Sequence, residues 1–189
     1  MKKVTIALTA LLISAASYAQ TWSIDKAHSK IGFGITHMSI SEITGNFKSF
    51  ESKITSAKKD FSDATIEFSA EANSINTEVE ARDKHLKSPD FFDAEKFASI
   101  TFKSTSFTKE KGNNYKVKGN LTMHGVTKPV TLDAKLVGTA TNPMSKKEMA
   151  GFKITGTINR ADFGIGGSMP EAMLSSKVTL NANTEFAKD

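Results

Sequence analysis

The sequence contains no cysteine, and it is poor in several other residue types that often mark a function. Its 189 residues include one Trp, two Tyr, four Pro and four His. The absence of cysteine excludes disulfides, thiol catalysis, thiolate metal ligands and a lipid attached through an N-terminal cysteine. Beyond the first 19 residues no segment is long and apolar enough to cross a membrane as a helix. Such a domain must be held together by its hydrophobic core alone.

Charge is also low and evenly spread. The formal net charge is +5, and the lysines are interleaved with Asp and Glu instead of forming a basic stripe with aromatic residues. That distribution argues against nucleic acid as a partner.

The first residues are typical of a secretory signal peptide. Lys2 and Lys3 precede an uncharged apolar run, and Ser17-Tyr18-Ala19 places small residues where a signal peptidase reads them. We predict a signal peptide at 1–19, cleavage before Gln20 and export to the periplasm. Loss of the two lysines would lower the net charge to +3. The remaining 170 residues, 20–189, are predicted to form a single domain.

Period-two alternation of apolar and polar residues runs through most of residues 20–189. It predicts eight strands that each bury one face, which favours antiparallel pairing. The runs start near Ile31, Ile43, Ala64, Ile100, Tyr115, Val130, Phe152 and Val178. A change of phase between Phe47 and Phe50 predicts a bulge. Because closure removes exposed edges, we predict an all-β, eight-stranded antiparallel barrel, with a sandwich as the alternative.

One charged segment interrupts the alternation. Thr77 with Glu80 fits a helix capping box, and Ser88-Pro89 fits the start of another helix. We therefore predict a helical insertion made of two short helices, at 78–86 and 89–96.

The apolar face of the barrel is expected to point inward. One Trp and two Tyr are too few for the two aromatic girdles of an outer-membrane barrel, and the polar faces carry many Lys and Glu. Many inward positions are small, which favours either a cavity for a ligand or a narrow, bent end of a packed barrel. The small residues are Gly45, Ala64, Ala70, Ala72, Gly119, Ala134, Gly156 and Ala182.

The sequence shows no specific catalytic constellation, and we predict no catalytic residues, no metal and no cofactor. No two of the four histidines have the spacing of a metal pair. His37 lies in the inward phase, either as a polar contact for a ligand or as a satisfied histidine at the rim. An alternative hypothesis is an enzyme or metal-dependent factor that uses His37 and His124 at the barrel mouth. Another is a stress-related envelope protein that docks a partner through the charged face Arg82–His85.

Several long motifs occur in an order that resembles the YceI-like family of exported bacterial proteins. They include Trp22, Asp25, His28, Ser29 and Phe33, then Gly45, Phe47 and Phe50, then the runs 82–93, 100–104, 121–130 and 159–164. The resemblance covers nearly all of residues 20–189. It implies a lipocalin-like eight-stranded barrel, a periplasmic location, frequent homodimers, no established catalysis, and a long isoprenoid or other amphiphile inside the barrel.

We therefore expect a non-enzymatic protein that binds, stores or transports a long apolar lipid, with contact to a membrane surface for exchange. The predicted ligand-binding residues are Phe33, Ile35, His37, Phe68, Phe102, Leu121, Met123, His124, Phe152, Ile154, Arg160, Phe163 and Leu180. Among these, His37, His124 and Arg160 are expected near the polar end of the ligand.

Overall fold

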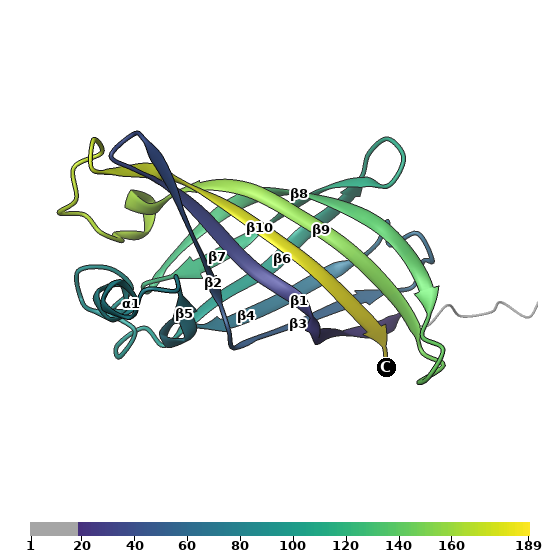
Figure 1. Cartoon of the computed structure of the whole chain (residues 1–189). Coiled ribbons are helices and arrows are strands. Elements are labelled where there is room, and N and C mark those ends of the chain that lie inside the picture. Colours follow the sequence, from purple (N-terminus) through teal and green to yellow (C-terminus); the bar gives the residue numbers. More distant parts are fainter. Residues whose placement is uncertain (1–18) are drawn as a thin grey trace, which may run out of the picture.

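A computed structural model describes residues 19–189, so the predicted signal peptide lies, apart from Ala19, outside the described residues. Strands dominate the fold (Figure 1). The strands are β1 Gln20–His37, β2 Ser41–Phe47, β3 Phe50–Ser56, β4 Thr65–Glu71, β5 Ile75–Asn76, β6 Ser99–Lys109, β7 Asn114–Met123, β8 Val126–Thr141, β9 Glu148–Asn159 and β10 Leu174–Lys188. The helical elements are α1 Glu80–Lys87 and the 3₁₀ turns Ala72–Ser74 and Arg160–Phe163. Within this part of the chain no helix is long and apolar enough to span a bilayer.

The sheet closes on itself. Its strand order is β10-β9-β8-β7-β6-β4-β3-β1-β2-β5, and an antiparallel pairing of β1 with β10 joins the two sides. β2 and β3 both pair with β1, so together they fill one position, and β5 adds only two residues beside β2. The result is a closed antiparallel barrel with eight strand positions, which confirms the predicted fold class.

The prediction of a bulge between Phe47 and Phe50 is wrong, because the structure has a break between two strands there. The chain ends β2 at Phe47 and begins β3 at Phe50, while the register shift lies opposite, in β1 between Asp25 and Lys30. β2 therefore pairs with the second half of β1 and β3 with the first half. A phase change in the alternation indicates that the apolar residues move from one face of the strand to the other. It does not distinguish a bulge within one strand from a break between two strands.

The helical insertion is also shorter than predicted. Only one helix forms, α1, and Ser88 is its C-cap instead of the start of a second helix. Val79 occupies the N-cap and makes no side-chain capping bond. Thr77 donates its backbone N–H and its hydroxyl to Asp83 instead, at 2.8 and 2.6 Å, so the predicted capping box does not form.

Two inward glycines accept neighbouring aromatic rings. In the register of the barrel Phe33 lies opposite Gly45, and a Cβ at Gly45 would stand 2.4 Å from Cζ of Phe33. A Cβ at Gly119 would stand 2.4 Å from Cζ of Phe102. These small residues therefore make room for rings that lie flat against the wall. Their small size alone does not create a cavity.

One end of the barrel is closed by packed aromatic side chains, and we call it the closed end. Phe61, on the loop between β3 and β4, is 1% exposed and has a left-handed backbone with φ of 55°. Its ring contacts Trp22 and Phe152 edge to face, each with ring centroids 5.2 Å apart. Phe186 packs on Phe152. The loop thus inserts Phe61 into the barrel as a plug.

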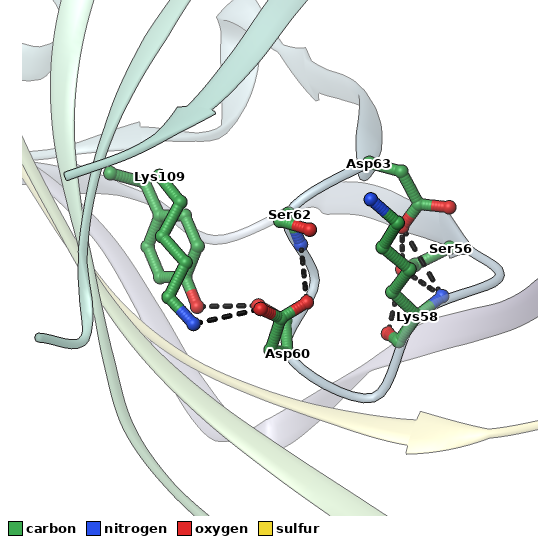
Figure 2. Close-up of polar contacts among 7 residues, drawn as sticks. Ser56, Lys58, Asp60, Ser62, Asp63 and Lys109 are labelled. Carbon is green, nitrogen blue, oxygen red and sulfur yellow. Dashed lines mark hydrogen bonds and ion pairs between the residues drawn. The ribbon is translucent and has the colours of Figure 1, made fainter.

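Polar contacts hold this plug loop in place, as Figure 2 shows. Asp60 accepts from Nζ of Lys109 at 2.8 Å, and the hydroxyl of Tyr115 donates to the carbonyl oxygen of Asp60 at 2.6 Å. The Lys109 bond and the backbone N–H of Ser62 lower the pKa of Asp60 to about 2. The Ser56 hydroxyl bond likewise lowers the pKa of Asp63.

We expect the closed end to loosen in acid. A carboxylate whose folded pKa is lowered adds stability above its unfolded pKa of 3.8, and this stability is lost as the pH falls toward about 2. Trp22 reports on the plug because it packs against Phe61 and is the single tryptophan of the sequence. Its fluorescence is expected to change between about pH 4 and about pH 2. Asp60→Asn together with Asp63→Asn should abolish most of that pH dependence; an unaltered profile in the double variant would contradict the assignment.

Candidate functional site

The barrel interior contains two adjacent chambers. The inner chamber, in the middle of the barrel, has a volume of about 140 Å³. The helix α1 and the β1–β2 turn lie at the same end of the barrel (Figure 1). The mouth chamber, at that end, has a volume of about 560 Å³. The two chambers are neighbours, because four residues line both of them. These shared residues are Phe33, Phe47, Met123 and Leu180.

The wall of the inner chamber is almost entirely apolar. Ile31, Phe68, Leu132, Ile154 and Ala182 are typical of its lining, and the polar side chains on it are Ser52, Asn181 and Thr184. Ser52 and Thr184 each donate their hydroxyl to a backbone carbonyl oxygen, at 2.9 and 3.1 Å. A chamber with this chemistry offers contact by dispersion and by removal of apolar surface from water.

The mouth chamber combines an apolar wall with basic and neutral polar groups. Arg82, Arg160, His37 and His85 are its ionisable lining residues, and no Asp or Glu lies among the described lining residues. Ser41 and Thr77 add hydroxyl groups. The mouth chamber therefore suits a polar or anionic group better than a cationic one.

The burial of inward side chains falls from the closed end toward the mouth. At the closed end Ile54, Phe61, Phe152 and Phe186 are at most 2% exposed. Toward the mouth, several inward residues remain only half-buried; these are Phe33, Ile35, Ile43, Phe47, Val178 and Leu180. These side chains face the interior, yet no other side chain packs fully against them. The barrel is thus a solid core at one end and an apolar-walled tunnel at the other.

Arg160 organises the mouth loop between β9 and β10. It is 5% exposed, and its guanidinium donates to five carbonyl oxygens. The acceptors are Ser175 at 3.0 Å, Ile165 at 3.0 Å, Gly166, Met169 at 2.9 Å and Leu174 at 2.9 Å. Every N–H of the side chain is therefore already used, and Arg160 borders the mouth chamber with its hydrogen bonds directed into the protein.

Helix α1 covers one side of the mouth chamber. Arg82 donates from Nε to the hydroxyl of Thr77 and from Nη2 to its carbonyl oxygen, both at 2.8 Å. Thr77 is itself buried. Arg82 and His85 both border the chamber, although His85 is also exposed to solvent, and Lys84 is exposed without bordering the chamber. The segment Arg82–His85 is thus not a uniformly solvated charged face, because its basic residues are divided between the chamber and the solvent.

Most of the predicted ligand-binding residues line a chamber. Those on the inner chamber are Phe33, Phe68, Phe102, Leu121, Met123, Ile154 and Leu180. Those on the mouth chamber are Phe33, Ile35, His37, Met123, Arg160 and Leu180. The structure therefore brings them together around two adjacent chambers, and their contact with a ligand stays a prediction.

Three predicted residues line neither chamber. Phe152 has the inward phase but packs with Phe61 at the closed end. Phe163 is 1% exposed, and its carbonyl oxygen is 3.0 Å from Nδ1 of His124. The ring of His124 also packs on Phe97, with centroids 4.8 Å apart. His37 and His124 are therefore not brought together in one chamber, and His124 has the satisfied surroundings of a structural histidine.

Several residues that line the mouth chamber are not among the predicted ligand-binding residues. Ile43, Phe47 and Val178 lie in alternating runs, so their phase was a usable signal. Phe91, Phe92 and Met169 lie outside any strand, and their place at the mouth follows from how the loops fold over the barrel. No periodicity in the sequence indicates that placement.

Within residues 19–189 one group of side chains has metal-ligating atoms close together. These atoms of Asp25, His28 and Glu185 lie within 4.8 Å of one another on the outside of the barrel. Nδ1 of His28 is 2.8 Å from Oδ2 of Asp25. This hydrogen bond lowers the pKa of Asp25 and raises that of His28. An ion pair at the β1 register shift accounts for the grouping.

The fold and the site together define a class of protein, a closed antiparallel barrel with an apolar, one-ended tunnel. Residues 22–186 match the family model described as a YceI-like domain, so the chain belongs to the YceI-like family. A UPF0312 protein of Serratia proteamaculans is 42% identical over 193 residues, covering 100% of both chains.

Solved structures agree with this assignment. The crystal structure of the Campylobacter jejuni YCEI protein has a TM-score of 0.74 and 32% sequence identity, covering 100% of this chain and 99% of that one. A domain of Saccharophagus degradans, described as a polyisoprenoid binding domain implicated in plant cell wall breakdown, has a TM-score of 0.65. At 15% identity, over 90% of this chain and 99% of that one, this likeness shows the fold alone.

Proposed function

We propose that this protein is a non-enzymatic carrier or store for a long apolar amphiphile, such as a polyisoprenoid or a similar lipid. The observation that carries the proposal is the fall in burial along the barrel. Half-buried apolar side chains are part of the lining of both the inner chamber and the mouth chamber. Leaving so much apolar surface unpacked weakens a core, at about 25 cal/mol for each Å² not removed from water, unless a ligand covers it.

The two chambers suggest an orientation for the ligand. The apolar tail occupies the inner chamber, where few polar groups face it. The polar head lies in the mouth chamber near Arg82, His37 and His85. The plug at Phe61 prevents the tail from leaving through the closed end. The ligand therefore enters and leaves through the mouth.

Family membership and the N-terminal sequence support the cellular setting. The Saccharophagus degradans domain of the same fold is described as polyisoprenoid-binding. The pattern of residues 1–19 favours export, so the protein is proposed to act in the periplasm and to exchange lipid with a membrane surface. The homodimer implied by the family resemblance stays a prediction.

Native extraction tests the proposed function. The protein is purified without detergent from its own envelope, extracted with organic solvent, and the extract is analysed by mass spectrometry. A long-chain lipid is expected in an amount close to one per barrel, and it should be recovered chemically unchanged after incubation with the protein. The proposed function would be refuted if no fraction contained lipid and the protein took up no added polyprenol.

A further inference from the structure

Three large apolar side chains stand exposed at the mouth of the barrel. Ile40 is 83% exposed, Met38 53% and Met173 50%. The first two lie on the turn between β1 and β2, and the third on the loop before β10, at the same end of the barrel as α1 (Figure 1). The backbone N–H of Met38 donates to the carbonyl oxygen of Met173 at 2.9 Å, which ties the two loops together. We call Met38, Ile40 and Met173 the mouth rim.

The backbone that presents the mouth rim is strained. Met38 and Ser39 have φ of 50° and 59°, in the left-handed region, and the N–H of Ile40 donates to the carbonyl oxygen of His37 at 3.1 Å. Asn and Gly are the usual residues at turn positions with a left-handed backbone. A methionine here gains nothing locally from its conformation or its exposure. An observed outlier of this kind points to a role for the side chain outside the folded chain itself.

The two segments that carry the mouth rim hold little charge. Glu42 and Glu171 are the only Asp, Glu, Lys or Arg residues in the segments 36–43 and 167–176. The carboxylate of Glu171 accepts from the hydroxyl of Ser176 at 2.8 Å. Apolar side chains at the tips of weakly charged loops match the boundary between the headgroups and the acyl chains of a bilayer, where apolar side chains are removed from water.

The mouth rim also borders the tunnel. Met173 lines the mouth chamber, as do His37 and Ser41, which flank the β1–β2 turn. A surface that covered the mouth rim would therefore cover the opening of the chamber. A lipid that passes from a bilayer into the tunnel at this point would not cross water.

We propose that Met38, Ile40 and Met173 insert into the interfacial region of a phospholipid bilayer and seat the tunnel opening on the membrane. This inference rests on the proposed function, because a carrier of a long apolar molecule must load and unload it without exposing the tail. The attraction is apolar, so it requires no anionic lipid and changes little with salt.

Vesicle binding tests the mouth rim with a matched control. Purified wild-type protein, Met38→Ser/Ile40→Ser and the control Val137→Ser/Met144→Ser are each sedimented with phosphatidylcholine vesicles. Val137 and Met144 are 67% and 89% exposed, and Met144 lies on the β8–β9 loop at the opposite end of the barrel. The mouth-rim variant is expected to bind at least about tenfold more weakly than wild type, and the control within about twofold of it.

The outcomes separate this inference from the proposed function. Equal vesicle binding by wild type and the mouth-rim variant would overturn the inference, even if native extraction recovers lipid. Binding that depends on the mouth rim would support it, even if extraction recovers none. Light scattering in the absence of vesicles tests a second copy of the chain as the occupant. A dimer that becomes a monomer in the mouth-rim variant would also overturn the inference.

Discussion

Ala182→Trp is expected to abolish retention of a long apolar ligand while the barrel still folds. Ala182 lies on the wall of the inner chamber, paired with Ile31 on one side and Ile154 on the other. An indole at this position would fill most of a chamber of about 140 Å³. If the tail loses about 100 Å² of apolar contact, binding weakens by about 2.5 kcal/mol, or roughly 60-fold.

Asn183→Trp is the matched control, because Asn183 is exposed on the outer face of the same strand. Both variants should have the circular dichroism of a β-protein, and only Ala182→Trp should lose co-purified lipid. Titration with a fluorescent polyprenol analogue measures the difference in affinity. If Ala182→Trp bound the analogue as tightly as Asn183→Trp, the tail would not occupy the inner chamber.

Arg160→Met is expected to destabilise the protein by about 3 to 5 kcal/mol. The substitution leaves five carbonyl oxygens of the mouth loop without their donor, in a region where Arg160 is 5% exposed. For a domain of this size the melting temperature should fall by about 10 °C. Arg160→Lys keeps the charge but lacks the planar fork of donors, so it should recover only part of the loss.

Unfolding in urea and hydrogen exchange over residues 164–175 measure this effect. The loop should exchange faster in Arg160→Met than in wild type, while the plug loop around Phe61 is unchanged. If Arg160→Met instead kept a normal melting temperature and bound lipid more weakly, Arg160 would contact the ligand head group, as predicted from the sequence. Its hydrogen bonds to the loop would then contribute little to stability.

The fold was accessible from the sequence because strand alternation is a local signal. In a run such as Tyr115–Met123 the alternation indicates which face of the strand is apolar. Closure of eight such strands into a barrel was predicted because it removes exposed strand edges. The phase change near Phe47 was visible as well, but its form depended on the partner strand. β1 carries the register shift that allows β2 and β3 to share one position.

The helical insertion shows a different limit. Thr77 with Glu80 has the spacing of a capping box, yet Thr77 bonds to Asp83 and Arg82 instead. A capping motif predicts hydrogen bonds at a helix N-terminus only if the side chains concerned have no competing partners in the folded protein. Here the side chain of Arg82 reaches back to Thr77, and the first turn of α1 forms around that contact.

The sequence by itself therefore determined an all-β barrel, the inward direction of its apolar face and a set of residues most of which line its chambers. Only the tertiary structure decided the height of each residue along the barrel axis. Phe152 and Phe33 have the same inward phase, yet one packs against the plug and the other borders the tunnel. Periodicity records a direction at each residue, whereas a cavity is the volume left over after strands distant in sequence have met.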